Sequence, residues 1–151
     1  MTAYDGPMEL PVRLLSETAQ MPVRAHDDDA AFDLRADEAL VLAPGRRATV
    51  RTGVALALAA GTAGLVLGRS GLAAKHGITV LNAPGLIDPG YRGEVMVILL
   101  NTDTSTPFEI NRGERIAQLL IVETLASTLS LAAVELDATA RGANGLGSTG
   151  R

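Results

Sequence analysis

The sequence predicts an all-β fold, a jelly-roll sandwich or barrel with one short helix. Short runs of β-branched and aliphatic residues, bounded by Gly, Pro, Asn and Asp, recur along most of the chain and indicate about eight to ten strands. Only residues 70–77 have the composition of a helix. At 151 residues the chain fits one domain, and with no Trp and 3% aromatic residues its core must be built from Val, Leu, Ile and Ala.

The N-terminal half is predicted to consist of short strands. Residues 10–15 form the first of them, and residues 30–58 alternate apolar pieces with turn residues. Such spacing is typical of strands of about five residues. Segments 49–58 and 64–69 flank the sequence AGTAG, so we expect a hairpin at this point.

The predicted helix, residues 70–77, has recognisable ends. Ser70 can cap its first turn, and Gly77 stands where a left-handed C-terminal residue belongs. Arg69 precedes this start, so the serine hydroxyl and the helix N-terminus also provide a place for an anion. From these residues alone, simple capping is the plainer interpretation.

Two further strands are predicted at residues 95–100 and 115–126. The first is a continuous apolar run, which indicates burial on both faces and therefore packing between subunits. In the second, Arg115 and Gln118 would lie on different faces of a regular strand, unless a bulge intervenes.

The stretch NAPGLIDPGYRGEV, residues 82–95, lies between two apolar runs and contains too much Gly and Pro for a regular helix or a continuous strand. We expect a shaped hairpin loop held on a rigid sheet. It displays one amide, one carboxylate and one aromatic ring, from Asn82, Asp88 and Tyr91, which is the composition of a small-molecule pocket. A Gly/Pro-rich turn with incidental polar residues is the alternative.

Charge and composition exclude several classes of function. A net charge of -4 argues against a footprint for duplex nucleic acid, although local Arg residues or a metal ion can still hold a triphosphate. The chain has no Cys and two His, which excludes disulfides and Cys nucleophiles and disfavours a His-built zinc site. We find no signal peptide, and the longest apolar stretch, 54–68, is too short to span a membrane, so a cytoplasmic protein is expected.

Two other features have an ordinary and a functional interpretation. Asp33 stands between apolar neighbours in AAFDLRA, where it either faces solvent on an alternating strand or is held at a site. The tail, residues 138–151, is Gly-rich and has too few apolar residues to join a core. It is either a disordered terminus or a flexible segment that wraps phosphates when a ligand binds.

Five segments, taken in order, resemble the five motifs of the homotrimeric deoxyuridine triphosphate pyrophosphatases, the dUTPases. They are AAFDLRA, GRSGLA, the central loop NAPGLIDPGYRGEV, RIAQLL and the tail RGANGLGSTG. The second and third are the most specific, and the tail gains weight as the fifth in order. The resemblance runs from about residue 30 to the end of the chain.

The resemblance implies a jelly-roll subunit in a homotrimer whose three active sites are shared between subunits. The reaction would convert dUTP and water to dUMP and pyrophosphate, with Mg2+ on the triphosphate, and so limit uracil in DNA and supply dUMP for thymidylate synthesis. Residues 1–137 would form the β domain, and the tail, 138–151, would close over the site. No nucleic acid or membrane partner is implied.

The resemblance also assigns roles to individual residues. Asp88 would be the general base on the attacking water, and Asp33 would belong to the hydrated metal site. The phosphate contacts would come from Arg69, Ser70, Gly71, Arg115, Gln118, Arg141, Ser148 and Thr149. Uracil and deoxyribose would be held by Asn82, Gly85, Leu86, Ile87, Tyr91 and Met96.

The chain departs from the family pattern at two positions, and three rival functions compete with this assignment. Leu146 stands where the family tail commonly carries an aromatic residue or His, so it would serve as an apolar lid over the base, and Ala31 replaces a usual Gly. The dCTP deaminases share the fold and the Ile-Asp-Pro-Gly-aromatic string, and here Glu94 would be their candidate glutamate. The second rival is a catalytically silent nucleotide-binding trimer, and the third is a purely structural β-sandwich.

Overall fold

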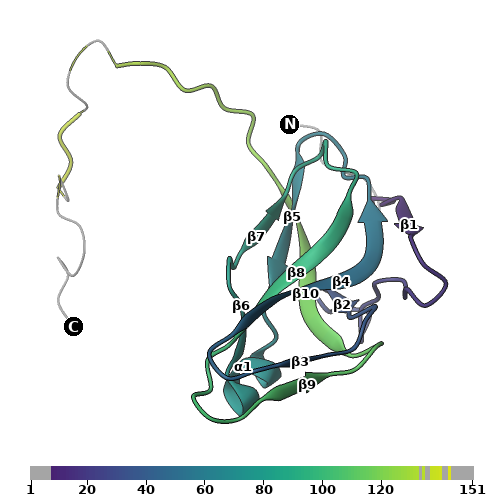
Figure 1. The fold of residues 1–151 in the computed structure, drawn as a ribbon. Coiled ribbons are helices and arrows are strands. Elements are labelled where there is room, and N and C mark those ends of the chain that lie inside the picture. The colour runs from purple at the N-terminus through teal and green to yellow at the C-terminus, as the bar shows by residue number, and fades with distance from the viewer. Residues whose placement is uncertain (1–7, 133, 135–136, 141–142, 144–151) are drawn as a thin grey trace.

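The protein was analysed as a computed structural model that describes residues 8–132, 134, 137–140 and 143 (Figure 1). Ten strands and one short helix make up the regular structure of these residues, as the sequence predicted. In chain order the elements are β1 (Val12–Leu14), β2 (Phe32–Arg35), β3 (Leu40–Leu42), β4 (Arg47–Leu56), β5 (Thr62–Leu67), α1 (Ser70–His76), β6 (Ile78–Val80), β7 (Gly85–Ile87), β8 (Glu94–Asn101), β9 (Phe108–Ile110) and β10 (Arg115–Glu123).

The strands form two four-stranded antiparallel sheets and a small ribbon. One sheet has the order β1-β4-β8-β6, the other has the order β2-β10-β5-β7, and β3 pairs with β9. The buried core draws aliphatic side chains from both large sheets, among them Val50 and Val97 from the first and Leu34 and Leu119 from the second. The sheets therefore share one aliphatic core, which confirms the predicted all-β architecture.

Strand β8 alternates between the two faces of its sheet. Val95, Val97 and Leu99 point into the core, whereas Met96 is 48% exposed on the opposite face. Burial on both faces, which the apolar run predicted, is therefore wrong for the single chain. The β8 side chains that face away from the core remain only partly covered, so packing against another subunit stays a prediction.

The helix ends where expected but begins one residue earlier than predicted. Arg69, in extended conformation, occupies the N-cap position without a side-chain cap hydrogen bond, and Ser70 is already the first helical residue. The prediction that Ser70 caps the helix is therefore wrong. Gly77 adopts the left-handed conformation, with φ 64°, and its N–H donates to the last-turn carbonyls.

The connections between strands cross from sheet to sheet more often than the sequence indicated. The segment 57–61 contains a turn, but it joins β4 in one sheet to β5 in the other, so the predicted hairpin there is wrong. The central stretch is a hairpin in part, because β6 and β8 pair with Val80 opposite Leu99. Between them, β7 leaves this sheet and pairs with β5 in the second one.

After β10 the chain leaves the sandwich. The described residues from 124 to 132 have no regular structure and run away from the two sheets (Figure 1). Their large apolar side chains are almost fully in solvent, with Leu125 94%, Leu129 97% and Leu131 99% exposed. Within the part of the chain that is described, no helix is long and apolar enough to cross a membrane.

Candidate functional site

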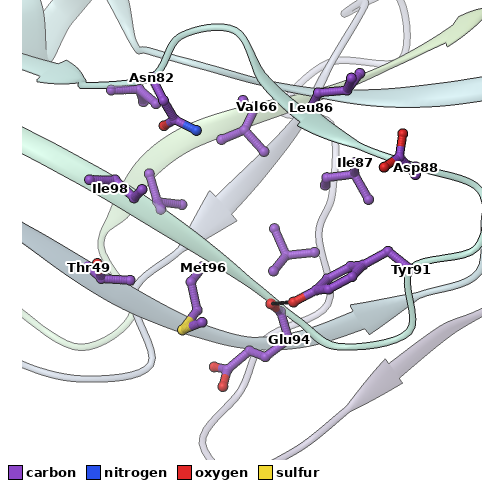
Figure 2. A pocket seen from close by; sticks show the side chains of 14 residues that line it. Thr49, Val66, Asn82, Leu86, Ile87, Asp88, Tyr91, Glu94, Met96 and Ile98 are labelled. Atoms are coloured by element: carbon purple, nitrogen blue, oxygen red, sulfur yellow. Dashed lines mark hydrogen bonds between the residues drawn. The ribbon is translucent and has the colours of Figure 1, made fainter.

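The central stretch forms one wall of a pocket of about 260 Å3 between β7 and β8 (Figure 2). Loop residues Asn82 and Asp88 stand at its rim with Tyr91, and strand β8 supplies the opposite wall. The pocket is open, and its volume is slightly below the roughly 300–1,000 Å3 typical of ligand sites.

The residues that the sequence assigned to the base, the sugar and the attacking water come together here. All seven line the pocket: Asn82, Gly85, Leu86, Ile87, Asp88, Tyr91 and Met96. Strand residues complete the pocket. Sequence reasoning missed six of them, which are Thr49, Val66, Val80, Val95, Val97 and Ile98, and it named Glu94 only for the deaminase alternative. The missed residues on β8 are aliphatic, and the sequence alone does not distinguish them from other core residues.

Local packing explains the shape of the loop. A side chain at Gly85 would approach the Val66 Cβ to 3.3 Å and the Asn82 amide nitrogen to 3.4 Å, so glycine lets the amide lie close to the loop backbone. The Tyr91 N–H donates to the Asp88 carbonyl at 3.0 Å, which closes the turn between the two residues. The peptide bond before Pro84 is cis.

Asp88 and Tyr91 differ in how they are held. The Asp88 side chain is exposed, and its carboxylate has neither a hydrogen bond nor an ion pair with any described residue. The Tyr91 hydroxyl donates to the Glu94 carbonyl at 2.9 Å (Figure 2). The pocket thus offers an unpaired carboxylate beside an anchored aromatic ring.

A second group of predicted residues surrounds Asp33. This carboxylate is only 5% exposed, so the interpretation that it faces solvent is wrong. One of its oxygens lies 3.1 Å from an Arg115 guanidinium nitrogen, and the other lies 3.6 Å from Arg69 Nε. Arg69 also donates to the Arg115 carbonyl at 3.1 Å. A buried carboxylate requires such charged partners because burial removes its water.

The strand register explains why these residues meet. Gln118 lies opposite Asp33, while Arg115 lies opposite Arg35, because a bulge between Arg115 and Ala117 shifts the pairing of β10 with β2. This is the bulge that the sequence required if Arg115 and Gln118 were to act together. Ser70 and Gly71 follow Arg69 directly at the start of α1, so the predicted phosphate contacts in the described part of the chain arise from β10 and the helix start.

The pocket and the Asp33 cluster have no residue in common. Asp33, Arg69, Arg115 and Gln118 are absent from the lining of the pocket, and none of the seven predicted pocket residues joins the ion pairs. Four predicted residues of the tail lie outside the described residues: Arg141, Leu146, Ser148 and Thr149.

The donor set around Asp33 bears on the expected magnesium ion. Over the described residues, no three His, Asp or Glu side chains gather in a way that could hold a metal. Mg2+ commonly keeps several waters and uses one or two carboxylates together with substrate phosphates. A single carboxylate beside two arginines therefore fits a metal that arrives with a triphosphate better than a metal held by the protein alone.

An acid at the rim of a pocket and two partly exposed arginines around a buried aspartate, both on a small β sandwich, are features of a protein that binds anionic small molecules. Comparison with known proteins makes this class specific. The sequence model of the dUTPase family matches residues 17–150, and the chain belongs to that family.

Individual relatives agree with this placement. The deoxyuridine 5'-triphosphate nucleotidohydrolase of Thermobifida fusca is 51% identical over 145 residues, covering 96% of this chain and 80% of the relative. The enzyme of the same name from Corynebacterium jeikeium is 47% identical, with 99% of each chain covered. The solved structure of the Staphylococcus bacteriophage 80alpha dUTPase with dUPNHPP matches with a TM-score of 0.88 at 31% identity, covering 95% of this chain and 99% of that one.

Proposed function

We propose that this chain is a dUTP diphosphatase, which hydrolyses dUTP to dUMP and pyrophosphate in a homotrimer. The observation that carries the proposal is the pocket, in which an unpaired Asp88 carboxylate lies with six residues assigned to the nucleoside. Membership of the dUTPase family and the names of the similar proteins support the choice of substrate.

Asp88 is the general base in this proposal. Its carboxylate accepts a proton from a water molecule while the water oxygen forms a bond to the α-phosphorus. The bond between that phosphorus and the oxygen that bridges to the β-phosphorus breaks, and pyrophosphate leaves. The exposed carboxylate makes no hydrogen bond or ion pair with any described residue, so it is available for this proton.

Phosphate binding falls to the cluster around Asp33. The guanidinium groups of Arg69 and Arg115, with the Gln118 amide, would hold the triphosphate and stabilise the charge that develops during transfer. Asp33 would contact the hydrated magnesium, which neutralises triphosphate charge when bound. The ion pairs of Asp33 fit a site where the phosphates of a bound nucleotide would pair with Arg69 and Arg115 in place of Asp33.

Base and sugar selection fall to the pocket. Asn82 and the main chain at Gly85 would hydrogen-bond the uracil edge, where a tight backbone wall leaves no space for the 5-methyl group of thymine. Tyr91 would pack against the deoxyribose and clash with a 2′-hydroxyl. Leu86, Ile87 and Met96 supply the apolar lining.

Assembly as a trimer would unite the two groups. Pocket and cluster share no residue within one chain, and in the proposed trimer the pocket of one subunit would lie against the cluster of another. The exposed leucines after β10 supply apolar surface for such contacts. We extend the proposal to the tail, where Arg141, Ser148 and Thr149 would contact phosphates and Leu146 would cover the base.

The deaminase alternative would assign proton transfer to Glu94. Its carboxylate is held by the Gly53 N–H at 2.8 Å and by Arg51 at 3.2 Å. These fixed contacts favour an anchoring role for Glu94, and no contact in the described residues favours the silent module over the pyrophosphatase.

The first experiment is product analysis with dUTP, dCTP, dTTP and UTP, each with magnesium and with a chelator. We expect magnesium-dependent dUMP and pyrophosphate from dUTP alone. Ammonia from dCTP would assign the protein to the deaminases, and no product from any nucleotide would make the silent module the better account.

The second experiment tests the base. Asp88→Asn should keep the assembly and nucleotide binding but lower kcat by at least about 100-fold, the usual contribution of a general base. Asp27→Asn, a change in an exposed acidic run, is the matched control and should leave kcat unchanged. Near-normal turnover by Asp88→Asn would disprove the general-base role.

A further inference from the structure

The Tyr91 ring is held at two points. Its hydroxyl donates to the Glu94 carbonyl at 2.9 Å, and the ring lies over Gly93. A Cβ at Gly93 would overlap the Tyr91 hydroxyl and approach its Cζ to 2.6 Å. The ring position therefore depends on a glycine below it and on the exact placing of the Glu94 peptide unit.

The Glu94 peptide unit is in turn fixed by the Glu94 side chain. Glu94 begins β8 opposite Ala55, and the pairing of β4 with β8 is irregular between Arg51 and Ala55. A break of this kind loosens the normal strand ladder. The Glu94 carboxylate bridges the break, because it accepts from the Gly53 N–H at 2.8 Å and from Arg51 Nε at 3.2 Å.

The contact between the Glu94 carboxylate and the Gly53 N–H has little freedom to move. The Glu94 side chain is 15% exposed, so its charge depends on the two donors more than on water. Gly53 adopts a positive φ of 66°, and the space next to it is filled by Ala19 and the Asp37 carboxylate. The donor that holds Glu94 is therefore itself fixed by its surroundings.

We propose that Glu94 is a positioning residue that fixes Tyr91 and thereby sets the preference for a deoxyribose over a ribose nucleotide. The inference rests on the proposed function, in which Tyr91 packs against the sugar. A ring fixed through its hydroxyl leaves no space for a 2′-hydroxyl, whereas a ring free to tilt can accommodate one. Rejection of an added group by shape requires such a rigid wall.

The test compares kcat/KM for dUTP and for UTP in the wild type and five variants. Tyr91→Phe removes the hydrogen bond from the ring hydroxyl to the Glu94 carbonyl. Glu94→Ala removes the carboxylate contacts with Gly53 and Arg51 that hold this carbonyl in place. Each should lower the dUTP/UTP ratio about tenfold, equivalent to about 1.4 kcal/mol. The double variant should lower the ratio no further than the single variants do, because both changes release the same ring.

Glu38→Ala is the matched control. Glu38 accepts the Arg51 backbone N–H at 2.7 Å, and among the described residues no hydrogen bond or ion pair joins it to β8 or Tyr91. It should leave the ratio unchanged. Gly93→Ala gives an independent check, because it displaces the ring while leaving the Arg51–Glu94 ion pair in place, and it should also lower the ratio.

The outcomes separate this inference from the proposed function. Wild-type protein that cleaves dUTP and UTP equally well, or neither, would overturn the proposed function and the inference with it. Wild-type selectivity that persists in Glu94→Ala would overturn the inference alone. Additive losses in the double variant would also overturn it, because they would show that Glu94 acts on the sugar by a route other than Tyr91.

Discussion

The Asp37 carboxylate is a buried anchor whose loss should measurably destabilise the fold. It is 7% exposed and accepts the Ser16 and Thr18 hydroxyls at 2.6 Å each, which ties the segment after β1 to the sandwich. Hydrogen bonds to a charged group contribute about 1.5–3 kcal/mol each. Asp37→Asn keeps one acceptor oxygen but loses the other bond and the charge, so the free energy of unfolding should fall by about 1.5–3 kcal/mol.

The pH dependence provides a sharper test. The hydrogen bonds from Ser16 and Thr18, together with the charges of Arg112 and Arg51, lower the pKa of Asp37 below its ordinary value of 3.8, against the opposing effect of burial. A lowered carboxyl pKa stabilises the fold above the unfolded-state value, and this contribution is lost as pH falls through the folded-state value. The stability difference between wild type and Asp37→Asn should therefore shrink as pH falls below about 4.

The assay is thermal unfolding at fixed protein concentration between pH 3 and pH 7, since the proposed trimer would make Tm depend on concentration. Near neutral pH, Asp37→Asn should lower Tm by about 3–12 °C, at about 2–4 °C per kcal/mol for a chain of this size. Asp103→Asn, which alters a surface turn, is the control and should give a smaller shift. A difference between wild type and Asp37→Asn that stays constant across the pH range would refute the argument.

Two further changes test the packing around these elements. Gly53→Ala should destabilise the fold by at least about 1–3 kcal/mol, because φ is 66° and a Cβ would lie 2.7 Å from an Asp37 carboxylate oxygen; an unchanged urea midpoint would contradict this. Asn101→Ala should cost about 2–4 kcal/mol, because the buried amide donates to the Leu42 and Thr106 carbonyls, which would lose their partner. Calorimetry would measure the second effect, and a loss below about 0.5 kcal/mol would show that these carbonyls find other donors.

The pocket was predictable from the sequence because its polar residues are close together in one stretch. Asn82, Asp88 and Tyr91 lie within ten residues of one another, and Gly and Pro between them exclude a regular element. Loop composition therefore located the rim. Most of the wall supplied by β8 was not predictable in the same way, because Ile98 looks like a core residue until the alternation of the strand is known, and Met96 was assigned only through the family resemblance.

The environment of Asp33 could not be predicted from local sequence. The side chain of a strand residue between two apolar neighbours can point to either face of its sheet. For Asp33 the face is decided by the register of β2 with β10, a strand more than eighty residues further along the chain. The ion pairs with Arg69 and Arg115 are consequences of that long-range pairing. The wrongly predicted hairpin after β4 has the same origin, because a turn signal does not specify which sheet receives the next strand.

The chain contains no tryptophan and two tyrosines, Tyr4 and Tyr91, so its near-ultraviolet emission is tyrosine emission. Tyr91 lies in the pocket wall with its hydroxyl tethered, so a nucleotide that enters the pocket meets one of only two emitting groups (Figure 2). Ligand binding can therefore be followed in the unlabelled protein. The fluorescence of Tyr91 reports on the place where the substrate is expected to bind, and the Tyr91→Phe variant is the control that lacks this signal.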